Sequence, residues 1–210
     1  MTRATLLYGF DPLCGWCYVF GPTMDALRET FGARLDFELL CGGLVVGDRV
    51  QPMSAMRSYL RRAYPEAEAR SGVRFGRAFT EGLLEQDDVT LASEPACRAI
   101  FVAREIAGES KAFSLARRLT TALYHDGLDP TQPAVLDALA RELDLPDLVS
   151  RWNTPAARTL TQQGFALARA RSVSMYPTLM LQQGEQRSLV VRGYASPSEA
   201  IARVQQALAQ

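Results

Sequence analysis

Two cysteines, Cys14 and Cys17, lie close together near the start of the chain, in the stretch FDPLCGWCY at residues 10–18. A pair with this spacing can bind a metal, pack in a core as two small apolar side chains, or form and break a disulfide. A tetrahedral zinc site needs two further ligands, and no second close pair of ligands exists. The redox interpretation is therefore favoured over zinc. The other thiol and imidazole side chains of the sequence are Cys41, Cys97 and His125.

The residues around the pair predict a strand, a helix and a second strand. Residues 4–10 are mostly apolar, residues 20–31 carry large apolar side chains every three or four positions, and residues 35–39 alternate apolar with acidic side chains. Gly21-Pro22 is expected to bend the helix after its first turns. Two strands joined by a helix in this way should be parallel. The pair thus falls where the first strand passes into the helix, which is a stronger redox signal than spacing alone.

The start of this helix favours negative charge, because its first backbone N–H groups have no partner and the helix dipole is positive there. Cys14 is therefore expected to be exposed at the helix start as the attacking thiolate. Cys17 lies one turn further in, and we expect it to be more buried and to act as the resolving thiol. Trp16 should be exposed enough to touch a substrate. Asp11 is a candidate for tuning the protonation of the pair, although Asp-Pro also simply favours a turn.

The middle of the chain, residues 52–171, is expected to be helical. One helix start is predicted at Ser93-Glu94-Pro95, with Ser93 as the N-cap and proline in the first turn. Thr131 to Pro133 and Thr154-Pro155 open two further helices by the same reasoning. Period-two alternation is not sustained anywhere in this block, so no strand is predicted there.

The C-terminal end returns to strands. Residues 178–181 and 189–192 are apolar runs separated by a polar turn, which predicts an antiparallel hairpin, and SPSE at residues 196–199 predicts a capping box. The element order becomes βαβ, a helical block and ββα, which is the thioredoxin order with an insertion. We therefore predict an α/β fold with a thioredoxin-like domain formed by residues 1–51 and 172–210, and an all-helical insertion domain between them, at residues 52–171.

These features resemble the DsbA family of thioredoxin-fold thiol–disulfide oxidoreductases, most closely its cytoplasmic FrnE-like branch. That branch tends to show D-P-x-C-x-W-C, which is DPLCGWC at residues 11–17. The superfamily also has a cis-proline loop facing the redox pair, and MYPT at residues 175–178 matches it. The resemblance covers essentially the whole chain. It implies that the Tyr176–Pro177 bond is cis and that Tyr176 and Pro177 contact the substrate.

Two departures from the family pattern bear on activity. Gly15-Trp16 stands where the periplasmic oxidants have Pro-His, whose histidine stabilises the thiolate, so the disulfide of this chain should be less oxidising. Tyr176 is bulkier than the valine, threonine or isoleucine more often found before the cis-proline. It is expected to narrow the substrate groove.

The prediction is a thiol–disulfide oxidoreductase or isomerase that acts on disulfides or thiols of proteins or small molecules. It needs no cofactor and no metal, with glutathione as a candidate co-substrate and glutathione or a thioredoxin-type protein as the reductant. Basic and acidic residues balance at 23 each, which gives no electrostatic case for nucleic acid or an anionic membrane. The first residues lack the features of a secretory signal, so the expected location is the cytoplasm.

Two rival functions remain open from the sequence. A glutathione-dependent kappa-type transferase or isomerase, like 2-hydroxychromene-2-carboxylate isomerase, shares the inserted architecture but needs no resolving cysteine, so Cys17 argues against it. A redox-independent, chaperone-like binding module could use Met53, Met56 and Tyr59 as a groove, although such a stripe is more often core. Outside the pair, the residues expected to be structural are buried Cys41 and Cys97, with a regulatory thiol as the alternative, and His125 at a helix end.

Overall fold

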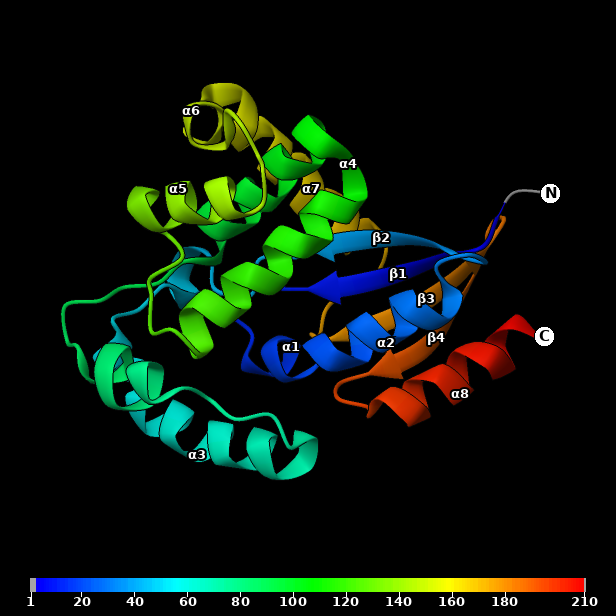
Figure 1. The fold of residues 1–210 in the computed structure, drawn as a ribbon, viewed down its shortest axis with the longest axis horizontal. Coiled ribbons are helices and arrows are strands. Elements are labelled where there is room, and N and C mark those ends of the chain that lie inside the picture. The colour runs from blue at the N-terminus through cyan, green and yellow to red at the C-terminus, as the bar shows by residue number, and fades with distance from the viewer. Residues whose placement is uncertain (1–2, 210) are drawn as a thin grey trace.

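A four-stranded sheet forms the centre of the computed structural model, which describes residues 3–209, and helices surround it (Figure 1). The predicted mixed α/β fold is confirmed. The elements are, in order, β1 (Thr5–Phe10), α1 (Gly15–Val19), α2 (Gly21–Phe31), β2 (Asp36–Cys41), α3 (Met53–Ser71), α4 (Ser93–Tyr124), α5 (Pro133–Glu142), α6 (Leu148–Trp152), α7 (Pro155–Ala170), β3 (Thr178–Gln183), β4 (Gln186–Arg192) and α8 (Pro197–Leu208). Short helical turns also occur at Gly47–Arg49, Ala78–Gly82 and Leu83–Glu85.

The strands lie in the order β2-β1-β3-β4. β1 pairs with β2 in parallel and with β3 in antiparallel orientation, and β3 pairs with β4 as an antiparallel hairpin. The predicted parallel pair and the predicted hairpin are both confirmed. Because β1 is an inner strand with both faces covered, Leu6 and Leu7 are both fully buried although they point to opposite sides.

The two faces of the sheet pack against different helices. Leu6 and Tyr8 belong to the large buried cluster that includes the apolar faces of α2 and α8. Leu7 and Met180 belong instead to a small cluster closed by Ala168 of α7. The alternation along β1 thus places two layers of helices around one sheet, as Figure 1 shows.

The predicted bend near Gly21-Pro22 is confirmed as a break between α1 and α2. Phe20 ends α1 and precedes α2, and Pro22 stands in the first turn of α2, where the missing N–H costs nothing. α1 is therefore a short, separate helix that carries the cysteine pair.

The predicted cap of α4 is wrong. Ala92 is the N-cap, and Ser93 is fully buried inside the first turn. Its hydroxyl donates to Asp11 Oδ1 at 2.8 Å and accepts from the backbone N–H of Val45 at 2.9 Å. The buried carboxyl group takes the Ser93 hydroxyl as a donor, while the first N–H of the helix, at Ser93, donates to Val45 O at 2.8 Å. The other predicted starts follow their local patterns: α5 begins at Pro133 after its N-cap Gln132, Thr154 caps α7, and the capping box at 196–199 is present.

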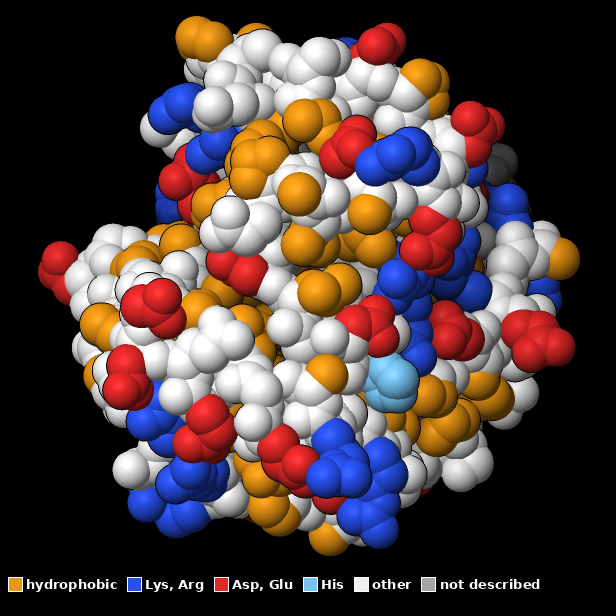
Figure 2. All heavy atoms as spheres, turned by 60° about the vertical axis from the view of Figure 1, so that its left-hand side comes forward, with side chains coloured by type: hydrophobic (Ala, Val, Ile, Leu, Met, Phe, Trp, Pro, Cys, Tyr) orange, Lys and Arg blue, Asp and Glu red, His pale blue; other side chains and the backbone are white. Residues whose placement is uncertain are grey.

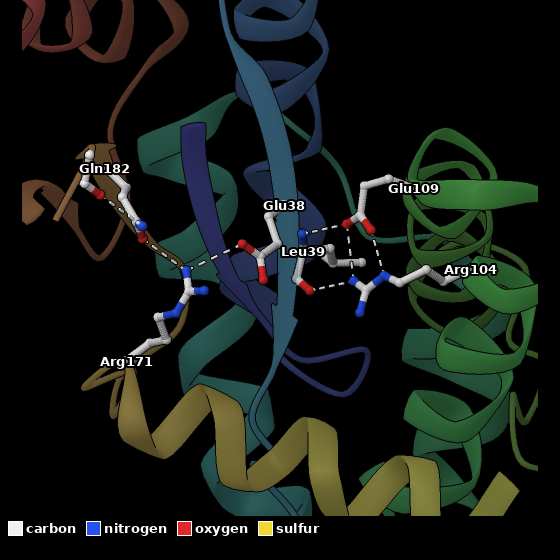
Figure 3. Close-up of polar contacts among 7 residues, drawn as sticks. Glu38, Leu39, Arg104, Glu109, Arg171 and Gln182 are labelled. Atoms are coloured by element: carbon white, nitrogen blue, oxygen red, sulfur yellow. Dashed lines mark hydrogen bonds and ion pairs between the residues drawn. The ribbon is translucent and has the colours of Figure 1, made fainter. Parts of the chain in front are cut away.

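α4 is bent at Ala107 and Gly108, where Gly108 has a φ of +80°. The bend brings Arg104 and Glu109 to the outer edge of β2 (Figure 3). Glu109 Oε1 accepts from Leu39 N at 2.6 Å, and Arg104 Nη2 donates to Leu39 O at 2.5 Å. Side chains thus satisfy backbone groups that a neighbouring strand would otherwise take.

A second polar contact ties the loop before β3 to the sheet. Arg171, directly after α7, donates through Nη1 to Glu38 Oε2 at 3.2 Å and to Gln182 Oε1 at 3.0 Å (Figure 3). The contact joins β2, β3 and the end of α7. These hydrogen bonds therefore hold the start of the segment between α7 and β3 against the sheet.

The helices between β2 and β3 share the core of the sheet. One buried cluster contains Leu6 of β1 and Phe20 together with Ile100 and Leu119 of α4. Helix α3 lies apart from α4 to α7, beside α1 (Figure 1). On the face drawn in Figure 2, basic and acidic side chains lie interspersed. Within residues 3–209, no helix is both long enough and apolar enough to span a bilayer.

Candidate active site

Cys14 is the N-cap residue of α1, with extended backbone angles, and its carbonyl accepts from Cys17 N at 2.9 Å and Tyr18 N at 3.1 Å. Cys17 lies one turn into the helix. The prediction that Cys17 is the more buried thiol is confirmed, with residue exposures of 1 % for Cys17 and 6 % for Cys14. The prediction that Cys14 is exposed is wrong, because it lies on the floor of a groove.

The loop before β3 faces the pair. The Tyr176–Pro177 peptide bond is cis, as predicted, and the carbonyl oxygen of Tyr176 lies 3.6 Å from Cys14 Sγ. Pro177 is buried behind this carbonyl, and its own carbonyl accepts from Gly193 N at 2.9 Å. The structure therefore brings Tyr176 and Cys14 together, and it places Pro177 outside the groove wall.

A groove of about 530 Å³ opens above Cys14, between α1, α3, the end of α4 and the loop before β3. This volume is within the usual range for small-molecule sites. Its lining is mainly apolar and aromatic. The side chains that form most of the wall are Leu13, Trp16, Met56, Tyr59, Leu60, Tyr64, Phe75, Phe79, Tyr124, Met175 and Tyr176.

The stripe on α3 divides between core and groove. Met53 is buried in a second core cluster, as the more frequent interpretation predicts. Met56 and Tyr59 line the groove instead, and Tyr59 is 55 % exposed. For these two side chains the core interpretation is wrong, because α3 covers the mouth of the groove rather than the sheet.

Trp16 forms one side of the groove entrance. It is half-buried, and its ring centre lies 6.1 Å from that of Tyr194. The guanidinium of Arg70, from the last turn of α3, lies 5.3 Å from the Trp16 ring centre, a cation–π distance. The expected partial exposure of Trp16 is confirmed, and the side chain also joins α1 to α3.

Asp11 is fully buried below the groove. Its carboxylate accepts from Leu13 N at 2.9 Å, from Leu44 N at 2.6 Å and from the hydroxyl of Ser93. Burial raises the pKa of Asp11 to about 6, while these hydrogen bonds and the charge of Arg49 act in the opposite direction. Asp11 thus ties the loop that carries the pair to the segment after β2 and to α4.

The Tyr176 ring packs on the backbone at Gly42. A Cβ built on Gly42 would lie 1.7 Å from the Tyr176 hydroxyl and 2.6 Å from its Cζ. Burial raises the pKa of Tyr176, so the phenol keeps its proton at neutral pH. A bulky residue before the cis-proline therefore requires glycine at position 42.

Several aromatic residues of the site were missed by sequence reasoning. The Tyr124 hydroxyl donates to Leu13 O at 2.5 Å, and the Tyr18 hydroxyl donates to Arg74 O at 2.9 Å. Phe75 packs against both rings, with centre distances of 5.4 Å to Tyr124 and 5.1 Å to Tyr18. Phe75 and Phe79, four positions apart, were the available signal, whereas Tyr124 is distant in the sequence.

The remaining thiols are fully buried, as predicted for Cys41 and Cys97. Cys97 Sγ lies 4.0 Å from Asp11 Oδ2, and burial raises the pKa of Cys97 well above its ordinary value. His125 follows α4 and is exposed, as expected for a helix end (pale blue in Figure 2). Within residues 3–209, no three His, Cys, Asp or Glu side chains are grouped in a way that could hold a metal.

No protein-family model and no curated protein matches the chain. Among solved structures, a candidate protein disulfide isomerase from Nitrosomonas europaea is 24 % identical, with a TM-score of 0.86 over 100 % of this chain and 99 % of that one. The cytosolic disulfide reductase DsbM from Pseudomonas aeruginosa, also solved with GSH, is 25 % identical, with a TM-score of 0.82 over 98 % of both chains. A 2-hydroxychromene-2-carboxylate isomerase is 14 % identical, with a TM-score of 0.64 over 98 % of this chain and 94 % of that one.

These similarities extend over the whole chain, including the helices between β2 and β3. They agree with the mixed α/β architecture built on a four-stranded sheet. The FrnE-like branch stays a prediction. The chain has the DsbA-like thioredoxin fold that its two motifs predict.

Proposed function

We propose that the chain is a thiol–disulfide oxidoreductase in which Cys14 attacks and Cys17 resolves. The observation that carries this proposal is the position of Cys14 Sγ on the floor of the groove, 3.6 Å from the Tyr176 carbonyl, with Cys17 one helical turn behind it. The nucleophile in disulfide exchange is a thiolate, and Cys14 is the thiol of the pair that lines the groove. The similarity to DsbM, described as a cytosolic disulfide reductase, supports the same chemistry.

The reaction needs only the two thiols. The Cys14 thiolate attacks one sulfur of the substrate disulfide, a Cys14–substrate disulfide forms, and the other substrate sulfur leaves as a thiolate that takes up a proton. The Cys17 thiolate then attacks Cys14 Sγ, and the remaining substrate sulfur leaves in the same way. Two electrons have passed to the substrate, and the protein holds a Cys14–Cys17 disulfide. The reverse sequence oxidises a dithiol.

The groove favours substrates whose disulfide is flanked by apolar groups. Aromatic and aliphatic side chains such as Tyr64, Phe75 and Met175 line it, and Trp16 borders its entrance. A disulfide flanked by apolar groups gains burial there that a strongly charged one does not. Both peptide disulfides and small-molecule disulfides fit this description.

Glutathione is the proposed reductant. Two glutathione molecules reduce the Cys14–Cys17 disulfide and leave as glutathione disulfide, so electrons and protons balance. The DsbM structure with GSH supports this partner, and a reductase of this kind belongs in a reducing compartment such as the cytoplasm.

The test is reduction of a peptide disulfide by glutathione, with and without the protein. Turnover should disappear in Cys14→Ser and fall strongly in Cys17→Ser. It should persist in Cys41→Ala, because Cys41 is a buried thiol that takes no part in the reaction. Undiminished turnover in Cys14→Ser would contradict the proposal.

A second candidate is the kappa-type glutathione transferase or isomerase, because 2-hydroxychromene-2-carboxylate isomerase shares the fold. That chemistry needs glutathione bound beside one nucleophile and does not need Cys17. Glutathione-dependent conversion of a small aromatic substrate that survives Cys17→Ser, without disulfide reduction, would favour this candidate. Suppression of aggregation by the Cys14→Ser, Cys17→Ser double variant would instead favour a redox-independent binding module.

A further inference from the structure

A second cavity, about 250 Å³ in volume, adjoins the cysteine pair. It lies between α2 and the second half of α4 and shares no lining residue with the groove. Cys17 lines this cavity, whereas Cys14 lines the groove. The side chains of Asp25 and Glu142 on its rim are partly exposed, so the cavity reaches solvent. Its volume is enough for several water molecules at roughly 30 Å³ each.

Tyr8 and Cys17 line this cavity together. Tyr8 lies on β1, and its ring packs against Phe10, Phe20 and Phe113 at centre distances of 5.5, 5.8 and 6.3 Å. Burial, the Cys17 charge and a hydrogen-bonding contact with Cys17 hold the pKa of Tyr8 well above its ordinary value. The phenol therefore keeps its proton and can act as a donor to the Cys17 sulfur.

Arg117 places a positive charge in the wall of the same cavity. Its guanidinium packs on Gly21, where an added Cβ would lie 2.5 Å from Arg117 Cζ. Arg117 Nε lies 3.6 Å from Asp25, but the buried Nη1 has no hydrogen-bond partner among residues 3–209. The Arg117 charge acts to lower the pKa of Tyr8, and Arg117, Tyr8 and Cys17 line the same cavity.

The resolving thiol has a proton to lose. Burial raises the pKa of Cys17 well above its ordinary value, and contact with Cys14 acts in the same direction. In the mixed disulfide the substrate is attached to Cys14 and fills the groove. The proton of Cys17 must therefore leave on the side away from the groove, and the thiolate needs stabilisation there.

We propose that the second cavity is the proton exit of the resolving step, with Tyr8 and Arg117 stabilising the Cys17 thiolate; this inference rests on the proposed function. The Cys17 proton passes to water in the cavity. The thiolate, held by the Tyr8 hydroxyl, attacks Cys14 Sγ, the Cys14–substrate bond breaks, and the substrate leaves as a thiolate that takes a proton from water. In this proposal Tyr8 donates to the reacting Cys17 sulfur from the wall of the shared cavity, and Arg117 is a positioning residue that acts through Tyr8 and the cavity.

The pKa of Cys17 depends on the charged and titratable groups around it. These groups come from the elements packed on α1 and from the two cavities. They are Tyr8 of β1, Asp11, Cys14, Asp25 and Arg28 of α2, Arg117, Arg118 and Tyr124 of α4, Glu142 of α5, and Tyr176.

The experiment separates attack from resolution in one trace. Reduced protein is mixed rapidly with excess 5,5′-dithiobis(2-nitrobenzoate), which releases one coloured thiolate when Cys14 attacks and a second when Cys17 resolves. The rate of the first release rises with reagent concentration, and that of the second does not. A Cys14→Ser variant gives the background from the other thiols.

Tyr8→Phe should leave the first phase unchanged and slow the second by at least about tenfold, because a hydrogen bond to a charged sulfur is lost. The pH midpoint of the second phase should rise by roughly one unit. Arg117→Gln should shift it in the same direction. The matched controls are Tyr18→Phe, whose hydroxyl donates to Arg74 O instead, and Arg77→Gln, whose charge is paired with Glu81 at 2.8 Å and which lines neither cavity. Neither control should move the midpoint.

The outcomes discriminate between the two claims. A wild-type protein without two phases, or a second release that persists in Cys17→Ser, contradicts the proposed function itself. Two wild-type phases with an unchanged second phase in Tyr8→Phe contradict only the role of the cavity. A slower second phase with an unmoved pH midpoint in both Tyr8→Phe and Arg117→Gln also overturns it, because a packing defect alone would produce that result.

Discussion

Replacement of the buried Asp11 by asparagine should change how the stability of the protein depends on pH. Asp11 has a pKa of about 6 in the folded protein, against an ordinary value of 3.8, chiefly because burial opposes its charge. A group whose folded pKa is raised contributes stability that is present below the unfolded pKa and is lost as pH rises through the folded pKa. Asp11 therefore favours the folded state at low pH and costs stability at neutral pH.

The size of this effect follows from the shift. A difference of about two pKa units corresponds to about 3 kcal/mol at 1.36 kcal/mol per unit. An asparagine side chain cannot ionise, so the Asp11→Asn variant lacks this contribution at every pH. The substitution also changes the contacts to Leu13, Leu44 and Ser93, but the effect of those changes on the free energy of unfolding is the same at every pH. The pH dependence of the difference between the two proteins is thus the quantity that reports on Asp11.

The assay is urea unfolding of wild type and Asp11→Asn at several pH values from about 3 to about 7.5. The free energy of unfolding of wild type, relative to the variant, should fall by about 3 kcal/mol as pH rises from the unfolded pKa of 3.8 to the folded pKa of about 6, and then level off. Titration of other groups affects both proteins equally and cancels in the difference. If the difference in free energy of unfolding between the two proteins stays constant across this range, burial does not raise the pKa of Asp11 as we infer.

Three further predictions concern the groove, the sheet edge and the redox couple. Gly42→Ala leaves 1.7 Å between the new Cβ and the Tyr176 hydroxyl where about 3.4 Å is needed, so it should slow attack by Cys14 about tenfold. Added Tyr176→Val should restore the rate in the same stopped-flow assay, and failure to do so would locate the defect elsewhere. Arg104→Met should lower the urea-derived stability by about 1–3 kcal/mol, because Leu39 O loses its donor and Glu109 its partner; an unchanged midpoint would show that water replaces them. Equilibration with glutathione should give a potential no more oxidising than about −180 mV, because Gly15-Trp16 lacks the stabilising histidine, and a value near −120 mV would contradict this.

Features that depend on neighbouring residues could be predicted from the sequence. The hydroxyl of Thr154 and the capping box at 196–199 reach backbone groups within three positions, so a local pattern specifies them. The start of α1 at the cysteine pair is of the same kind. Ser93 shows the limit of such reasoning. Its local pattern indicates a cap, but its hydroxyl binds Asp11, which is 82 positions away in the chain.

The candidate site also contains features set by nearby residues and features set by residues distant in the chain. The pair and the cis-proline loop could be identified from two short motifs, yet the groove depends on where α3 packs relative to α1. Periodicity gives the apolar face of a helix and not its partner, so the sequence left open whether Met56 and Tyr59 lie in the core or line a groove. The placement of Tyr8 and Cys17 in one cavity likewise depends on how α1 packs against β1, which no spacing in the sequence encodes.

The central claim, that Cys14 attacks and Cys17 resolves, is tested most directly by the mass of the trapped intermediate. Reduced Cys17→Ser is mixed with glutathione disulfide, and the protein is quenched with acid and weighed. The account predicts one glutathione bound per chain, and peptide mapping should place it on Cys14. Cys14→Ser treated in the same way should remain unmodified, because Cys17 is buried to 1 % exposure and faces away from the groove. An adduct on Cys17 in Cys14→Ser, with none on Cys14 in Cys17→Ser, would contradict the assignment.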